Sequence, residues 1–381
     1  MFAGSASCAG CHKNMYDSFV HTAHYLSSHV ADNQSIKGSF EQGKNIFVFG
    51  NAIVAMEETD SGFYQNEYTR HLENNTARYE QVNGKRFDIV IGSNTKGQSY
   101  LYWDSGQLYQ LPISYFTVTG SWCNSPGYPY RAVYNRIVTA RCLECHSTYA
   151  KIISKQNKVP EQLDQNRILY GITCEKCHGA AAKHVAYQTQ HPEITTAKYI
   201  INPAKFSRQQ SLDLCALCHS GGGLYKTKPT FSFTSGDAIA NNFTSDTTPI
   251  NVHKIDVHGN QYGLLRASQC FIKSEAMTCN TCHNTHQAER GNTVLFSQRC
   301  LSCHNTQNAV ACPLTARLGA SVISKNCIDC HMPLSASKNI SVSLPGDTAT
   351  KSAYVRSHYI SIYPAETDKI LTLIKEKQNH Q

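Results

Sequence analysis

The sequence predicts a mainly α-helical protein with many loops, into which an antiparallel β module is inserted after the first of seven cysteine motifs. Two observations predict this fold. The Cys-x-x-Cys-His motifs, which short helices carry, are unevenly placed: one lies at the N-terminus and six fall between Cys142 and His331. Between His12 and Cys142 the pattern changes to alternating apolar and polar residues, which is typical of half-buried strands.

The seven motifs contain fourteen of the seventeen cysteines, and a histidine directly follows each pair. Their letters are CAGCH, CLECH, CEKCH, CALCH, CNTCH, CLSCH and CIDCH. The candidate site residues are Cys8, Cys11, His12, Cys142, Cys145, His146, Cys174, Cys177, His178, Cys215, Cys218, His219, Cys279, Cys282, His283, Cys300, Cys303, His304, Cys327, Cys330 and His331. Chance does not repeat one pattern seven times in a chain of this composition, so these residues share a chemistry.

Covalent haem attachment is the chemistry that this spacing predicts. Two thiols can add across the two vinyl groups of a haem, while the adjacent imidazole binds the iron from the same side. Zinc sites also use cysteine pairs and histidines, but zinc does not require a histidine directly after the second cysteine of every pair. A disulfide scaffold explains an even number of cysteines and leaves the seven histidines unexplained. We therefore expect seven haem c groups per chain.

A second axial ligand for each iron is expected among the eleven histidines outside the motifs. These are His21, His24, His29, His71, His184, His191, His253, His258, His286, His358 and His380. Methionine is the rival ligand, but only five methionines are present, and Met332 directly follows His331 and cannot reach the far side of the same ring. We expect low-potential, bis-histidine haems with distal metal ligands at His24, His184, His258, His286 and His358. For each remaining histidine a surface or hydrogen-bonded role stays open.

Two of these histidines follow a motif closely in sequence. His286 lies three residues after His283, about 4.5 Å along a helix, which is too short a reach to cross the porphyrin and bind the same iron. His184 lies six residues after His178. We expect both to bind the iron of a haem attached elsewhere in the chain, which would tie adjacent haems into one stack.

The formal charge of +8 invites comparison with nucleic-acid-binding proteins. Haem changes the sum, because each one brings two propionates. Seven haems would take the assembly from +8 to about +1 oxidised and about −6 reduced. The excess of lysine and arginine is then a set of counterions for propionates, and no nucleic-acid partner is expected.

The setting is expected to be periplasmic or extracellular, because the cysteine content fits an oxidising compartment or heavy cofactor loading. No apolar run approaches the length of a transmembrane helix. Residues 1–7 lack the charged and apolar regions of a signal peptide, so the numbering is expected to be that of a mature or trimmed chain.

Four segments are expected along the chain: 1–30 with the first motif and a helix, 31–140 as the β module, 141–335 with six haems, and 336–381 with a distal ligand and a helix. The first helix is expected over 13–28 and the last near Pro364. Strands are expected at IFVFG, FYQNEYTR, RFDIVIG, SYLYW and QLYQLPISYFTV, with a hairpin turn at 104–106. The polar stretch 227–251 is expected to be a loop with at most one short strand.

Several segments resemble a known family. SCAGCHKNMYDSFVHTAHY, CEKCHGAAAKH, TCNTCHNTH, CIDCHMP and RSHYI resemble the multihaem cytochrome superfamily that includes hydroxylamine oxidoreductase and the tetrahaem cytochrome of nitrifying bacteria. VHGNQYGLL, FDIVIGS and GQSYLYW resemble a Bacteroidetes-type branch of it. The resemblance implies the five distal ligands named above, a helical haem domain and a periplasmic or surface setting. It implies no reaction: a Cys-x-x-Cys-Lys motif and an eighth haem motif, which catalytic relatives carry, are both missing.

Two functions compete on this evidence. The first is electron transfer by a carrier that is not an enzyme, with other redox proteins or an extracellular electron acceptor as partners and possible self-association through haem-exposed surfaces. Its variant is a subunit of a cytochrome filament. The alternative is a multi-electron oxidoreductase that acts on a small nitrogen or sulfur compound at one open haem. The carrier is favoured because the non-motif histidines outnumber the seven distal positions by four.

Three cysteines lie outside the motifs: Cys123, Cys270 and Cys312. Cys270 and Cys312 flank the fifth and sixth motifs, so we expect a disulfide between them, with Cys123 left unpaired. The alternative is that all three are small buried residues with reduced thiols. A copper or thiolate-ligated haem site at Cys123 is the least favoured reading, since no other soft ligand is near it in sequence.

Overall fold

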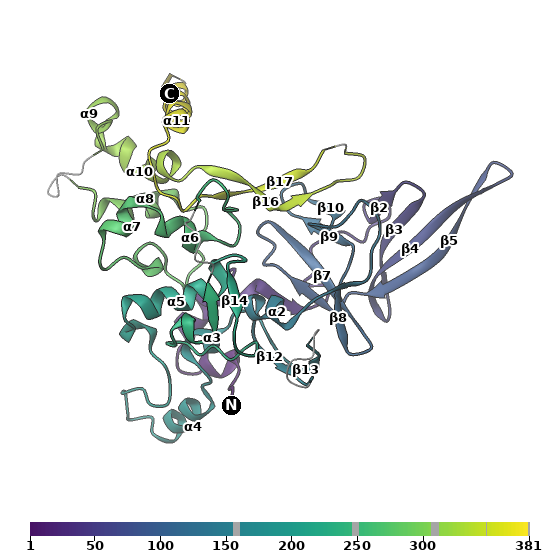
Figure 1. Cartoon of the computed structure of the whole chain (residues 1–381), viewed down its shortest axis with the longest axis horizontal. Coiled ribbons are helices and arrows are strands. Elements are labelled where there is room, and N and C mark those ends of the chain that lie inside the picture. The colour runs from purple at the N-terminus through teal and green to yellow at the C-terminus, as the bar shows by residue number, and fades with distance from the viewer. Residues whose placement is uncertain (155–160, 246–250, 306–311, 348, 380–381) are drawn as a thin grey trace. The chain divides into compact units, whose positions relative to one another are not determined.

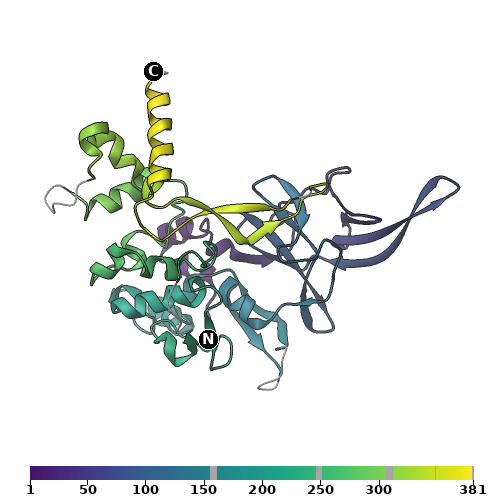
Figure 2. The same cartoon turned by 45° about the horizontal axis from the view of Figure 1, so that its top comes forward.

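The chain folds into two compact units, each assembled from segments that are far apart in sequence (Figures 1 and 2). The computed structural model describes residues 1–154, 161–245, 251–305, 312–347 and 349–379. The first unit comprises Met1–Ala204, Lys226–Ser235 and Lys338–Ala353, and the second comprises Lys205–Tyr225, Gly236–Ser337 and Tyr354–Gln381. The division into four segments expected from the sequence stays a prediction.

Antiparallel strands form most of the regular secondary structure of the first unit. Within the described residues, a seven-stranded sheet has the order β1-β6-β7-β8-β11, with β9 paired to β7 and β10 paired to β9. Its strands are β1 Ser28–Val30, β6 Ile89–Ile91, β7 Gly97–Asp104, β8 Gln107–Gln110, β9 Ile113–Phe116, β10 Ser121–Asn124 and β11 Arg136–Ile137. A second sheet, in the order β2-β3-β4-β5, contains β2 Ile46–Phe49, β3 Ala52–Thr59, β4 Gly62–Glu73 and β5 Thr76–Arg86. The β4–β5 hairpin extends well beyond the other strands of its sheet (Figure 1).

Short helices and one further strand pair complete this unit. The helical elements are η1 Ser5–Cys8, α1 Lys13–Phe19, η2 Tyr25–Ser27, α2 Ala140–His146, α3 Cys174–His178, α4 Ala182–Gln190 and η3 Pro203–Lys205. The strand pair is β12 Ser147–Ile152 with β13 Leu163–Tyr170. The first three motifs all lie in this unit.

Aromatic side chains form the core beneath the two sheets. Phe87, Tyr100 and Trp122 are almost completely buried, and the ring centroids of Tyr100 and Trp122 lie 5.6 Å apart. A side chain at Gly38 would overlap the indole of Trp122, since an added Cβ would lie 2.1 Å from it. Aromatic and apolar side chains from the strands therefore supply the packed core of this unit.

Two hairpin turns show why the strands reverse where they do. The β7–β8 turn holds Ser105 at φ 51° and Gly106 at φ 79°, and the β4–β5 turn holds Asn74 at φ 49° and Asn75 at φ 61°. Positive φ at both central residues matches the right-handed twist of the flanking strands. The hairpin expected at 104–106 is confirmed.

The second unit is mainly helical and contains the other four motifs. Its elements are α5 Arg208–His219, β14 Leu224–Lys226, η4 Ile239–Asn241, β15 Phe243–Ser245, α6 Gln261–Arg266, α7 Gln269–Lys273, η5 Cys279–Thr281, α8 Thr293–Leu301, α9 Thr315–Leu318, α10 Ala320–His331 and α11 Pro364–Asn379, plus parts of the antiparallel pair β16 Leu334–Val342 and β17 Lys351–Arg356. Leu212, Leu265 and Phe271 form a buried cluster in it. The helix expected near Pro364 is confirmed.

The expectation of a mainly α-helical protein is wrong. The structure is about 29% helix and 28% strand, with several antiparallel sheets. Two-stranded ribbons such as β16–β17 expose polar residues on most of their surface, so their apolar periodicity is weak and the sequence did not reveal them. The first helix is also shorter than expected, because α1 ends at Phe19. No helix among the described residues is long and apolar enough to span a membrane.

Candidate functional site

Every motif folds as a turn of helix, which places its two thiols and its imidazole on one side. Four motifs lie inside α2, α3, α5 and α10. In the other three, the amide of the motif histidine donates to the carbonyl of the first cysteine: His12 to Cys8 at 2.8 Å, His283 to Cys279 at 3.0 Å and His304 to Cys300 at 2.9 Å. Residues at i, i+3 and i+4 share a helix face, so each motif presents the arrangement that covalent haem attachment requires.

The first and third motifs are neighbours in the first unit. The thiols of Cys8 and Cys174 interact directly, and burial together with this interaction raises the pKa of Cys8 to about 11. The residues just before the third motif pack on the segment after the first, where Ile172 N–H donates to the His24 carbonyl at 2.9 Å. Gly171, at φ +70°, allows this contact, because a Cβ there would lie 2.1 Å from the Tyr25 carbonyl oxygen.

Glu175, inside the CEKCH motif, holds these two motifs together. Its side chain is buried, with 3% of its surface exposed. One carboxylate oxygen accepts from Ala3 N–H and from Ala181 N–H, and the other accepts from Gly4 N–H, each at 2.8 Å. Three N–H donors compensate for the water that the buried carboxylate has lost. The N-terminal segment with the first motif is thereby fastened to the helix of the third.

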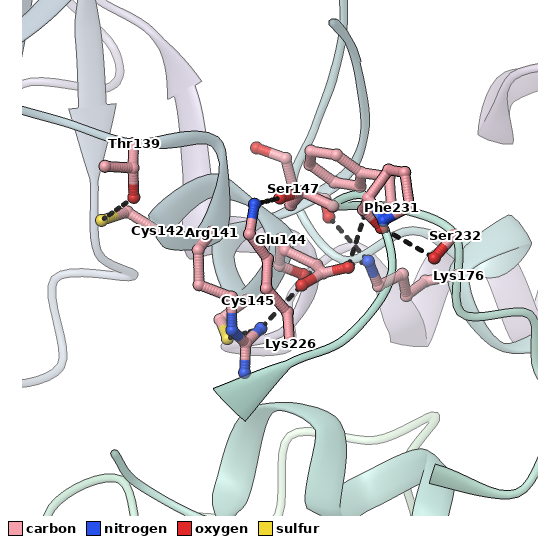
Figure 3. A network of polar contacts seen from close by, with 12 residues as sticks. Thr139, Arg141, Cys142, Glu144, Cys145, Ser147, Lys176, Lys226, Phe231 and Ser232 are labelled. Carbon is pink, nitrogen blue, oxygen red and sulfur yellow. Dashed lines mark hydrogen bonds and ion pairs between the residues drawn. The ribbon is translucent and has the colours of Figure 1, made fainter. Parts of the chain in front are cut away.

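Lys176, the next residue of the same motif, connects it to the second motif (Figure 3). Its ammonium donates to the carbonyl of Glu144 at 2.9 Å and to those of Ser147 and Thr148 at 3.3 and 3.4 Å. The Glu144 carbonyl is in the last turn of α2, where a cation is favoured by the helix dipole, and the other two carbonyls lie at the start of β12. The ammonium also lies 5.1 Å from the centre of the Phe231 ring.

The second motif contains a buried acidic residue, Glu144, which has 1% of its surface exposed. It pairs with Arg141 at 2.9 Å and accepts from Phe231 N–H at 2.7 Å (Figure 3). Arg141 donates to the sulfur of Cys145 as well, at 3.2 Å. A fixed positive charge therefore lies directly against one of the two attachment sulfurs of this motif.

The four motifs of the second unit follow one another in space as they do in sequence. A hydrogen bond from Cys215 lowers the pKa of Cys279, which links the fourth and fifth motifs. Burial raises the pKa of Cys300 to about 12, and the nearby thiols of Cys327 and Cys282 add to this rise. The sixth motif therefore lies beside both the seventh and the fifth.

The rings of His358 and His283 lie close together, at a spacing that would suit two ligands on opposite sides of one haem iron. Their rings are nearly parallel, 20° apart, with centroids separated by 6.0 Å. With a metal–nitrogen bond of about 2 Å and about 1.1 Å from that nitrogen to the ring centre, two imidazoles on opposite sides of one metal ion have centroids about 6 Å apart. Burial lowers the pKa of His358 to about 4, with a further contribution from His283, so the neutral imidazole that binds a metal is present at pH 7.

Other histidines hold one ring nitrogen in a hydrogen bond that leaves the second nitrogen available. Nδ1 of His178 donates to the Ile201 carbonyl at 3.0 Å, and Nδ1 of His331 donates to that of Ser361 at 2.8 Å. Nδ1 of His184 donates to the Lys198 carbonyl at 2.9 Å. A carbonyl can only accept, so the proton is on Nδ1 and Nε2 carries the lone pair, as in histidines that bind metals. The side chains therefore fit haem iron.

The remaining distal candidates are less well defined. Burial lowers the pKa of His258, and the amide of His258 donates to Asp256 at 2.8 Å. For His24, His258 and His286 the assignment to an iron stays a prediction. By contrast, His71 pairs with Glu80 at 3.4 Å on the β4–β5 hairpin, and His380 lies outside the described residues.

The expected disulfide between Cys270 and Cys312 is wrong. No disulfide joins any of the seventeen cysteines, all of which lie within the described residues. The two thiols lie beside different motifs: that of Cys270 is near Cys303, whereas that of Cys312 is near Cys327. Cys123 is completely buried in β10, where burial raises its pKa to about 12.

Three reactive thiols are therefore expected when the haem-loaded protein is unfolded without reductant and treated with iodoacetamide. In the folded protein Cys123 should resist alkylation, because its thiol has no exposed surface and a pKa of about 12. Peptide mass mapping distinguishes the sites. A single reactive thiol after unfolding would instead show that Cys270 and Cys312 are bonded.

Sequence reasoning missed the charged residues inside the motifs. Glu144, Glu175 and Asp329 are the acidic residues between motif cysteines. All three are engaged, the last by an ion pair with Arg356, which also donates to the Met332 carbonyl at 3.0 Å. The signal was available, because an acidic residue next to a haem attachment point needs a donor or a cation nearby. Among the described residues, no group of three or more histidine, cysteine or acidic side chains is arranged to hold a metal ion alone.

Comparisons with known proteins agree with this chemistry. The family model described as "Cytochrome c554 and c-prime" matches residues 131–179, which include the second and third motifs. The structure resembles the crystal structure of the outer cell wall cytochrome OcwA with a TM-score of 0.57 and 15% sequence identity, over 97% of this chain and 81% of that one. No curated protein matches the sequence.

The expected placement in the hydroxylamine oxidoreductase superfamily is not confirmed at the level of a branch. Both matches are to cytochromes, and the matched family model includes two of the motifs that present two thiols and one imidazole on one face. The matches and the motifs together support a multihaem c-type cytochrome.

Proposed function

We propose that this chain is a periplasmic or extracellular electron carrier that holds seven haem c groups, mostly with bis-histidine ligation. The fourteen motif cysteines would form the thioether bonds, and His12, His146, His178, His219, His283, His304 and His331 would be the proximal ligands. Bound haem c supplies a one-electron ferric/ferrous couple at each of these positions. The motif turns hold each imidazole and its two thiols in register.

The contact between different motifs is the observation that carries this proposal. In the first unit, Lys176 joins the second and third motifs, and Cys8 touches Cys174 between the first and third. In the second unit, the fourth to seventh motifs form a series through their thiols. If each haem acted independently of the others, the attachment motifs would not need to lie next to one another.

Ligation on both sides of the iron favours a carrier over an enzyme, because a substrate needs an open coordination position. The 6.0 Å separation of the His283 and His358 rings supports one such pair. His184, with Nδ1 bonded to a carbonyl, is suited to a second. We infer the same role for His24, His258 and His286.

The setting and partners are inferred from likeness. OcwA is described as an outer cell wall cytochrome, and a location outside the cytoplasm is proposed here on that basis. Other redox proteins or an extracellular electron acceptor are the proposed partners. Either kind of partner could accept electrons at the surface of this protein without entering a binding cavity in it.

Seven covalent haems and seven electrons per chain are expected for the protein matured in a host that attaches haem c. Intact mass after acid denaturation counts the haems, and reductive titration of the native protein counts the electrons. Carbon monoxide should leave the ferrous spectrum unchanged, since in an electron carrier each iron would have two axial ligands and no open position. A mass with fewer than seven haems would contradict the stoichiometry, whereas a carbon monoxide complex would favour the oxidoreductase.

A further inference from the structure

We propose that two copies of this chain associate through the outer edge of β5, in antiparallel register around Tyr79. Strand β5 pairs with β4 and with no other strand in the part of the chain that the structure describes. An unpaired edge presents a row of backbone donors and acceptors to any strand that can match it. The segment 76–82, TARYEQV, contains none of the lysines or prolines that commonly block such edges.

The turn of the hairpin determines which backbone groups face outward. Asn74 and Asn75 form a two-residue turn with positive φ, so the pair that flanks it, Glu73 and Thr76, is a hydrogen-bonded pair. Hydrogen-bonded and non-bonded pairs alternate along an antiparallel ladder. The backbone N–H and C=O groups of Ala77, Tyr79 and Gln81 therefore point away from β4.

Charge selects one register among those that this edge allows. With the two-fold axis at Tyr79, Arg78 of each copy lies directly opposite Glu80 of the second copy, so two pairs of opposite charge form. The outward groups also match: Tyr79 faces its counterpart, and Ala77 faces Gln81 as a hydrogen-bonded pair. An axis at Arg78 or Glu80 would place two like charges directly opposite each other, which is destabilising.

The surroundings of this edge also favour a second copy. From Thr69 to Val82 the hairpin has two arginines and two glutamates, so two copies do not repel each other. Tyr79, Leu72 and Val82 are 54, 68 and 53% exposed, so this hairpin has apolar surface that a second copy could cover. Pairing about Tyr79 would cover its own ring against that of the second copy, a favourable aromatic cross-strand contact.

Existing ion pairs do not prevent this association. Within one copy Arg78 contacts Glu73 at 3.0 Å, and Glu80 contacts His71 at 3.4 Å. These partners lie on β4 or next to the turn, whereas the second copy approaches from the opposite edge. All four side chains are more than half exposed, so the partners inside one copy are screened by water and hold them only weakly.

Complementary charge reversal tests the proposal on the haem-loaded protein. Sedimentation velocity over a range of concentrations should show a monomer–dimer equilibrium for the natural sequence. Arg78→Glu places glutamate opposite Glu80, and Glu80→Arg places arginine opposite Arg78, so each variant alone should dimerise at least tenfold more weakly. An equal mixture of the two variants restores both opposite-charge pairs and should form a heterodimer of the original strength.

The matched control is Arg167→Glu, which reverses an exposed arginine on β13 and should leave the equilibrium unchanged. A monomer at every accessible concentration would overturn the proposal, as would a dimer that survives either single reversal. Failure of the mixture to associate when each single variant is folded and monomeric would overturn the register. Haem content is measured on the same samples and does not depend on the outcome.

Discussion

Replacing His358 by alanine should convert one of the seven haems from the low-spin to the high-spin state without detaching it. The imidazole of His358 lies 6.0 Å from that of His283, centroid to centroid, and under the proposed ligation its loss would remove the second ligand of the fifth haem iron. The thioether bonds of that haem depend on Cys279 and Cys282, which the substitution does not touch. The expected change is therefore confined to ligation.

Electron paramagnetic resonance and intact mass measure the two halves of this prediction. About one seventh of the ferric signal should become high-spin, the mass should still include seven haems, and added imidazole should restore the low-spin signal by occupying the vacated position. His71→Ala is the matched control, because His71 is an exposed histidine that pairs with Glu80. If His358→Ala and the control give the same spectrum, His358 is not an axial ligand.

Glu175→Ala should release the N-terminal segment from the third motif and lower the free energy of unfolding by about 3 kcal/mol. The substitution leaves three N–H groups, those of Ala3, Gly4 and Ala181, without the carboxylate that accepts from them. A buried donor that loses its acceptor costs about 1–3 kcal/mol, and water that enters the vacated space recovers part of the sum. Glu175→Gln keeps one carbonyl oxygen, so its effect should be smaller.

Hydrogen exchange locates this effect, because local opening exposes particular amides. In Glu175→Ala the amides of Ala3, Gly4 and Ala181 should exchange about a hundredfold faster or more, the change that corresponds to about 3 kcal/mol. Glu58→Ala serves as the control, since Glu58 is an exposed glutamate on β3 in the same unit. Unchanged exchange at all three amides would show that Glu175 does not fasten the N-terminal segment.

The attachment motifs could be predicted from the sequence because their geometry is local. A cysteine, a second cysteine three residues on and a histidine after it lie on one face whenever the backbone forms a helical turn. The structure forms that turn at CAGCH and CNTCH even where no α-helix contains the whole motif, through His12 and His283. The strands of the β module were readable for a similar reason, since alternation along one strand depends on one buried face.

Strands with mostly polar residues could not be predicted in the same way. β5 is polar along most of its length, and β16 exposes Leu334 and Lys338, so neither shows the alternation of a half-buried strand. Both strands form because a neighbouring strand accepts and donates hydrogen bonds to their backbone groups. This pairing depends on the neighbouring strand and cannot be seen in the sequence of the segment itself. The helical class was overestimated for this reason.

The sequence by itself determined the seven Cys-x-x-Cys-His motifs and the eleven further histidines, from which seven attached haems and a second ligand for each iron are predicted. Only the tertiary structure decided that His358 faces His283, that Glu175 binds the amides of Ala3 and Gly4, and that Cys270 and Cys312 lie beside different motifs. The physical reason is the range of the interactions. A motif is specified by dihedral angles within five residues, whereas contacts between distant segments depend on the path of all the chain between them.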